Sequence, residues 1–165
     1  MKWLPIAVKD PSNKEAREKM SLAANLGGMA ITASGCSIGH SFAQTFGAVN
    51  HIPHGLGCAW GLPGVMVYSA KYGNRSDLEI VADALGVSYT DETDTMDLAN
   101  EMAQIFVDFM KEIHIKSIKS LGYSLEDCLA VTERFFHDGA FANSPGTPGV
   151  PEIQEFIKYT YHIYQ

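Results

Sequence analysis

The chain has 165 residues, a formal net charge of −7 and a hydrophobic fraction of 46%, which is the size and composition of one globular domain. The acidic balance and the absence of a Lys/Arg cluster argue against nucleic-acid binding, because phosphate contacts need a basic surface. No apolar run approaches the roughly 20 residues of a membrane span, and three cysteines without a C-x-x-C motif fit a reducing, cytoplasmic location.

The N-terminal part is expected to form an extended lead-in over 1–11 and a long helix over 12–32. Ser12 and Glu15 have the spacing of a capping box, which marks the start of a helix. Apolar side chains then recur at helical spacing, at Ala16, Met20, Ala23, Leu26 and Ala30. The helix also carries small residues that permit close packing, so we expect a core helix: Ala23, Ala24, Gly27 and Gly28.

Two shorter helices are expected next, over 37–46 and 54–68, joined by a loop over 47–53. Pro63 should kink the second of them or end its first segment, because proline lacks the N–H that continues a helix. The remaining apolar patterns predict helices over 74–84, 95–115, 125–136 and 152–164. No segment alternates as a strand would, so the prediction is all-α: one helical domain over 1–165, with six to eight helices.

The chemistry concentrates between Gly35 and Pro63. His40 and Gln44 lie four residues apart and therefore share one face of the expected helix. His54 follows Pro53 at the start of the next helix. Two imidazoles from neighbouring helices can converge on one point, and such a point suits a transition metal.

The same segment resembles the metal signature of the iron-containing (group III) alcohol dehydrogenases. GHSFAQTFG, a short loop, PHG and a helix ending in LP correspond to that family's G-H-x-x-A-H-x-L-G, loop, P-H-G, A and L-P. EAREKMSLAANLGGMAI resembles the helix before the signature, and FANSPGTPGVPEIQEFIKYTY resembles the closing loop and last helix. The resemblance therefore covers nearly the whole chain.

The resemblance implies that His40 and His54 are metal ligands and that the metal is Fe²⁺ or Zn²⁺. It implies NAD(P)-dependent hydride transfer between small alcohols and aldehydes or ketones. Gln44 stands where the family often has histidine. Because an amide cannot titrate, Gln44 is expected to orient a substrate or cofactor hydroxyl rather than relay a proton.

Two family features have no counterpart in this sequence. One is the glycine-rich phosphate loop of an N-terminal nucleotide-binding domain, and the other is an Asp-x-x-x-His pair that supplies two more metal ligands. We therefore expect the C-terminal half of a dehydrogenase, inactive alone, which needs that domain or a separate chain that supplies it. Met1 is compatible with a native start or with a chain boundary, and a homo-oligomer is also open.

Three alternatives accompany this hypothesis. Cys36 and Cys58 with His40 would make a zinc–thiolate site. His51, on the loop before Pro53, would substitute for the missing family histidine. In the third alternative the chain is a stand-alone helical interaction module that kept the fold without the chemistry.

Overall fold

The computed structural model describes all 165 residues, and every regular element in it is helical. The predicted all-α fold is therefore confirmed. None of the helices combines the length and apolar character that crossing a bilayer requires. The α-helices are α1 (Trp3–Lys9), α2 (Lys14–Ser34), α3 (Ile38–Asn50), α4 (His54–Tyr72), α5 (Arg75–Leu85), α6 (Thr95–Glu112), α7 (Leu125–Leu129) and α8 (Val150–Ile163). Short 3₁₀ turns are η1 (Lys119–Leu121), η2 (Thr132–His137) and η3 (Phe141–Asn143).

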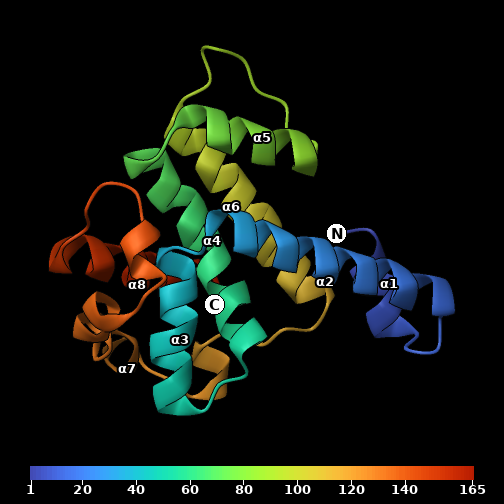
Figure 1. Cartoon of the computed structure of the whole chain (residues 1–165), viewed down its shortest axis with the longest axis horizontal. Coiled ribbons are helices and arrows are strands. Elements are labelled where there is room, and N and C mark those ends of the chain that lie inside the picture. The colour runs from blue at the N-terminus through green and yellow to red at the C-terminus, as the bar shows by residue number, and fades with distance from the viewer.

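Helix α4 is the centre of the bundle, and α3, α5, α6 and α8 all contact it (Figure 1). A helix surrounded on several sides must be apolar or small on all of them. Trp60, Met66 and Tyr68 are buried on α4, together with four of its glycine and proline residues. The sequence of α4 thus explains why this helix, rather than a more amphipathic one, takes the central place.

Two groups of buried side chains hold the bundle together. The larger group joins α3, α4 and α8 and includes Phe42, Phe46 and Ile153. The smaller group joins α4, α5 and α6 and includes Leu78 and Leu98. Each fully buried side chain of this size contributes about 1.5–3 kcal/mol by leaving water, so the two groups fix α3 and α4 against the rest of the chain.

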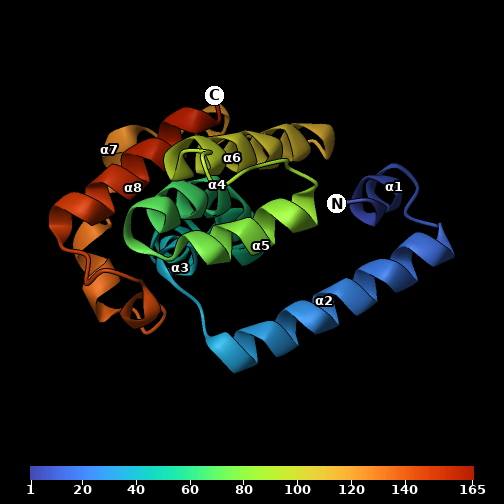
Figure 2. The same ribbon diagram turned by 90° about the horizontal axis from the view of Figure 1, so that it is seen from above.

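Helix α2 lies apart from this bundle, and α1 packs against α2 (Figure 2). Ala16 is its only buried residue, and Leu26 is 54% exposed. The expectation of a core helix was therefore wrong. A Cβ atom added at Gly27 or Gly28 would also meet no atom within 4 Å, so these small residues do not serve close packing. An apolar stripe predicts that a helix forms, but it does not identify the element that covers the stripe.

Several predicted boundaries differ from the structure. Asn13, not Ser12, caps α2 by accepting a hydrogen bond from the Ala16 amide, while Ser12 donates to Asp10. Helix α3 continues to Asn50, so most of the expected loop over 47–53 is helical.

Helix α4 passes through Pro63 and does not end there. The expected helix over 125–136 is divided into α7 and the 3₁₀ turn η2.

Candidate metal centre

The first turns of α3 and α4 carry the two histidines. His40 is the third residue of α3, between the buried Ile38 and Phe42 that anchor this helix in the core. His54 is the first residue of α4, directly after Pro53, whose extended backbone begins the helix. The core packing of Ile38 and Phe42 therefore positions the backbone of His40. The first turn of α4 positions the backbone of His54.

Glycines bring α3 and α4 unusually close together. A Cβ atom at Gly57 would lie 2.9 Å from the Ala43 Cα atom, and one at Gly61 would lie 2.9 Å from the Gly39 carbonyl oxygen. Real Cβ atoms do not approach other atoms so closely, so both positions require glycine as the backbone is placed. This close approach lets a side chain of α3 reach a side chain of α4 across the interface between the two helices.

His40 and His54 meet at this interface between α3 and α4. Their ring centroids are 4.5 Å apart and the ring planes are inclined by 67°. Cys58, one turn beyond His54 on α4, places its Sγ atom 3.6 Å from His40 Nδ1 and 3.4 Å from His54 Nε2. One donor atom from each of the three side chains lies within 4.8 Å of the other two. Two imidazoles and a thiol form a donor set that a divalent transition metal accepts.

The electrostatics of the group favour uncharged side chains. Burial, followed by the nearby His54, lowers the pKa of His40, and the Asp138 carboxylate partly offsets this effect. Burial, followed by the neighbouring Cys36, raises the pKa of the Cys58 thiol. Neutral imidazole is the form that ligates a metal, so His40 is held ready for a cation.

A carboxylate supports the face of α3 next to the histidines. Asp138 accepts hydrogen bonds from the Ser41 hydroxyl at 2.7 Å and from the Ala140 amide at 3.0 Å. With its amide nitrogen turned toward the carboxylate, Gln44 donates to both oxygens of Asp138, at 3.0 Å from Oδ1. Asp138 thus connects the segment after η2 to α3.

The structure brings His40 and His54 together, as the hypothesis of convergent imidazoles requires. Gln44 is exposed and faces Asp138, so its expected role toward a substrate hydroxyl stays a prediction. The group of donors contains Cys58 but not Cys36. His51 caps α3 in a left-handed conformation, with a φ of 54°.

Two further residues of this site, Cys58 and Asp138, differ in the local sequence signal that they carry. The zinc–thiolate alternative named Cys58 together with Cys36 and His40, and the spacing of four between His54 and Cys58 places these two on one face of α4. Asp138 lies in a turn with no motif, and only the folded chain brings it to α3. Spacing along one helix relates Cys58 to His54, whereas no local signal could have identified Asp138.

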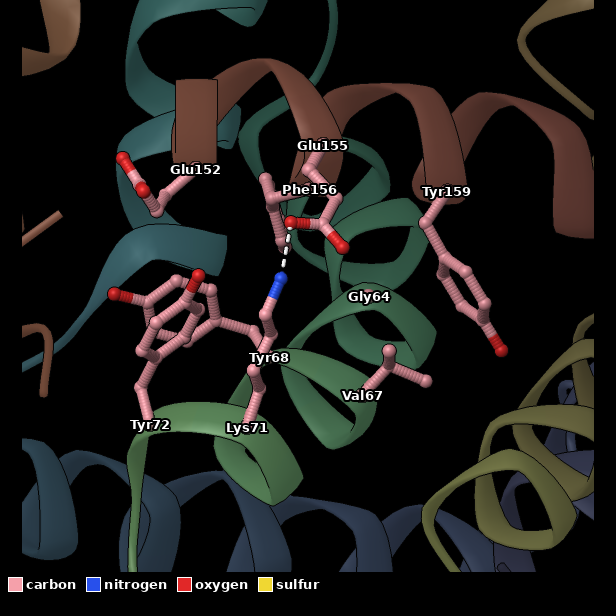
Figure 3. A pocket seen from close by; sticks show the side chains of 9 residues that line it. All are labelled: Gly64, Val67, Tyr68, Lys71, Tyr72, Glu152, Glu155, Phe156 and Tyr159. Carbon is pink, nitrogen blue, oxygen red and sulfur yellow. Dashed lines mark hydrogen bonds and ion pairs between the residues drawn. The ribbon is translucent and has the colours of Figure 1, made fainter. Parts of the chain in front are cut away.

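A small cavity lies between α4 and α8, away from the three donors (Figure 3). Its volume is about 50 Å³, far below the roughly 300 Å³ at which ligand pockets begin. Tyr68 lines it and donates to the Pro145 carbonyl at 2.6 Å, and burial raises the pKa of Tyr68 to about 12. Lys71 and Glu155 form an ion pair at its rim. The cavity does not have room for a substrate.

Comparison with solved structures and curated proteins agrees with the arrangement of the helices. The solved structure described as "Crystal structure analysis of 1,3-propanediol oxidoreductase" superposes on 95% of this chain with a TM-score of 0.82 and 26% sequence identity. It is matched over 41% of its own length.

Two curated alcohol dehydrogenases also match nearly the whole chain. The NADPH-dependent butanol dehydrogenase of Clostridium saccharobutylicum is 29% identical over 91% of this chain and 39% of its own length. The 1,3-propanediol dehydrogenase of Citrobacter freundii is 29% identical over 94% of this chain and 40% of its own length. The chain thus spans about two fifths of the length of these relatives.

A family profile covers almost the whole sequence. Residues 1–161 match the profile described as "Fe-containing alcohol dehydrogenase family, C-terminal". The fold, the relatives and this profile agree on one assignment, and the resemblance seen in the sequence is confirmed. The chain belongs to the Fe-containing alcohol dehydrogenase family, of which it represents the C-terminal part.

Proposed function

We propose that this chain is the metal-binding part of an NAD(P)-dependent alcohol dehydrogenase that interconverts small alcohols and aldehydes or ketones. The observation that carries the proposal is the convergence of His40 and His54 from two helices, with ring centroids 4.5 Å apart. Family membership supplies the reaction class, and the names of the relatives, which include butanol and propanediol dehydrogenases, support small alcohols as substrates.

His40 and His54 would hold a divalent metal, Fe²⁺ or Zn²⁺, through neutral imidazole nitrogens. Bound there, the metal supplies Lewis acidity that lowers the cost of negative charge developing on a substrate oxygen. The histidines do not exchange protons in this role, because a protonated imidazole cannot ligate. The lowered pKa of His40 keeps its ring neutral over a wider pH range.

Gln44 and Asp138 would act beside the metal ligands. Gln44 lies one turn after His40 on the same helix and is exposed to solvent. Its amide can present both a donor and an acceptor to a substrate or cofactor hydroxyl. Asp138 holds the amide nitrogen, which leaves the carbonyl oxygen of Gln44 to accept a hydrogen bond. Gln44 would therefore orient a hydroxyl group.

The nicotinamide cofactor would be bound by residues outside these 165. In this proposal a nucleotide-binding domain, or a separate chain that supplies it, joins the helical bundle so that the hydride acceptor faces His40 and His54. A homo-oligomer is compatible with this arrangement. The NADPH dependence named for the butanol dehydrogenase makes NADPH one cofactor to test beside NADH.

A chimeric enzyme tests the proposal. The part of the Clostridium butanol dehydrogenase that precedes the matched region is fused to this chain and loaded with Fe²⁺ or Zn²⁺. We expect alcohol-dependent NAD(P) reduction that His40→Ala and His54→Ala abolish, whereas His162→Ala, on the exposed face of α8, leaves it intact. Turnover that survives both substitutions at the metal centre would contradict the proposal.

One observation favours a second candidate function, the stand-alone interaction module. Helix α2 exposes several large apolar side chains beside the bundle: Leu22, Leu26, Met29 and Ile31. Such a face commonly marks a contact with another protein. A chimera with normal catalysis would favour the dehydrogenase, and a folded chimera without metal binding or catalysis would favour the module.

A further inference from the structure

Cys58 is placed between the two histidines in a way that their shared role does not require. Its sulfur lies 3.6 Å from His40 Nδ1 and 3.4 Å from His54 Nε2, so it is in contact with both rings. The side chain is half-buried and comes from α4, one turn after His54. All three donor atoms therefore face one small volume between α3 and α4.

The two sulfur–nitrogen distances match those expected within a coordination sphere. Zinc–sulfur bonds of about 2.3 Å and zinc–nitrogen bonds of about 2.0–2.1 Å at tetrahedral angles place sulfur and nitrogen about 3.6 Å apart. Both observed separations lie within about 0.2 Å of that value. A single ion can thus contact the sulfur and either nitrogen with little movement of the side chains. The three donor atoms lie within 4.8 Å of one another, so contact with both nitrogens at once requires the two imidazoles to move closer together.

Hydrogen bonding alone accounts less well than coordination for the position of Cys58. A thiol is only a weak donor and a weak acceptor, so hydrogen bonds to the two imidazoles would hold the sulfur less firmly than a bond to a metal ion. A metal ion bound by all three side chains accounts for both contacts of the Cys58 sulfur together.

We propose that Cys58 is a third metal ligand, beside His40 and His54, and that its thiolate adapts this site to Zn²⁺ rather than Fe²⁺. This proposal rests on the proposed function for the role of the two histidines. On binding, the Cys58 S–H bond breaks, the proton passes to solvent and the sulfur forms a bond to the metal. Three protein ligands leave a fourth position open, and thiolate is a softer ligand than Fe²⁺ prefers.

Titration of the full 165-residue chain with Co²⁺ alone tests the proposal, because Co²⁺ occupies zinc sites and reports its ligands by absorption. We expect a near-ultraviolet sulfur-to-cobalt charge-transfer band in the wild-type chain. Cys58→Ser should abolish the band and weaken Co²⁺ binding by at least about tenfold, since even the loss of a supporting residue costs about 10–100-fold. Cys36→Ser is the matched control, because Cys36 is a half-buried thiol nearby but outside the donor group. It should retain the band.

A second measurement does not depend on the stability of a variant. Zn²⁺ should slow the alkylation of Cys58 in the wild-type chain, and mapping of the labelled peptides should show Cys36 alkylated at an unchanged rate. In a competition experiment, Zn²⁺ should displace Fe²⁺ from the wild-type chain. Cys58→Ser should reduce this preference for Zn²⁺ over Fe²⁺. Unchanged alkylation of Cys58 at saturating Zn²⁺ would overturn the proposal.

The outcomes separate Cys58 from the histidines. Co²⁺ binding that His40→Ala and His54→Ala abolish, without a charge-transfer band, overturns the role of Cys58 and leaves the two-histidine site intact. Co²⁺ binding that neither histidine substitution affects overturns both proposals. If the chain binds no Co²⁺, the role of Cys58 in the isolated chain is overturned, and the chimera decides the proposed function independently.

Discussion

Gln44 lies one turn beyond His40 on α3, yet its amide is turned toward Asp138, a residue from the far end of the chain. Asp138 also accepts hydrogen bonds from the Ser41 hydroxyl and the Ala140 amide. The face of α3 that carries His40 is therefore tied to the turn after η2 by one carboxylate. The position of His40 therefore depends on contacts distant from it in sequence.

Replacement of Gln44 by glutamate should expose this dependence. Gln44→Glu places a second carboxylate against Asp138, and the repulsion should lower the free energy of unfolding at pH 7. Gln44→Ala removes only the hydrogen bonds and should cost about 0.5–1.5 kcal/mol. The deficit of Gln44→Glu should shrink as pH falls toward about 4, where carboxyls protonate. Urea denaturation at several pH values measures this, and a pH-independent deficit would contradict the contact.

The glycines between α3 and α4 give a second test. Gly61→Ala forces a Cβ atom against the Gly39 carbonyl and should cost about 1–3 kcal/mol, with weaker Co²⁺ binding because the helices separate. Gly55→Ala is the control, since its Cβ atom meets nothing within 4 Å. It should stabilise α4 by about 0.5–1 kcal/mol, because alanine loses less backbone entropy. Equal effects of the two substitutions in urea denaturation would argue against close packing of α3 and α4.

The titration of His40 in the metal-free chain should follow its surroundings. Its pKa is lowered in the folded chain, first by burial and then by His54, so its NMR midpoint should lie below 6.5. His54→Ala should raise the midpoint toward 6.5, because a neighbouring positive charge is lost. Asp138→Asn should lower it further, because the carboxylate favours the imidazolium.

The same shift has a consequence for stability. Because the folded pKa is lowered, the unfolded chain binds more protons between that pKa and 6.5. The stability contributed by neutral His40 is complete above pH 6.5 and decreases as the pH falls through this window. His40→Gln should remove this part of the pH dependence in thermal denaturation. A wild-type midpoint at or above 6.5 would contradict the burial of the ring.

The position of α2 outside the bundle predicts unequal costs of two leucine truncations. Leu26 is 54% exposed on α2, whereas Leu98 is 1% exposed on α6. Leu26→Ala should change the free energy of unfolding by less than about 0.5 kcal/mol, and Leu98→Ala should lower it by about 2–5 kcal/mol. Urea denaturation measures both. A cost at Leu26 similar to that at Leu98 would show that α2 is covered in solution.

The isolated chain should show no dehydrogenase activity. All of its regular elements are helices, and the sequence supplies no glycine-rich phosphate loop for a dinucleotide. Assays with NAD or NADP and several short alcohols, in the presence of Fe²⁺ or Zn²⁺, should give rates equal to those without protein. Circular dichroism on the same sample serves as the control for folding. Robust turnover would show that the chain binds nucleotide by itself.

Local patterns predicted much of the fold. The helical spacing of Leu98, Met102 and Ile105 indicated α6, and the helix expected over 74–84 corresponds to α5. The histidines were identified because their spacing and flanking residues are local too. The capping of α2 was misassigned by one residue, because Ser12 and Asn13 are both good caps and only the folded backbone selects Asn13.

The sequence alone determined that helices form, that no strand does, and that His40 and His54 are the candidate metal ligands, because these properties depend on residues a few positions apart. Tertiary structure decided that α2 lies outside the bundle, that Asp138 supports α3, and that Cys58 rather than Cys36 joins the histidines. These relationships depend on how closely α3 and α4 pack and on which surfaces meet. Hydrophobic periodicity specifies that a face is apolar, but it does not specify the face that covers it.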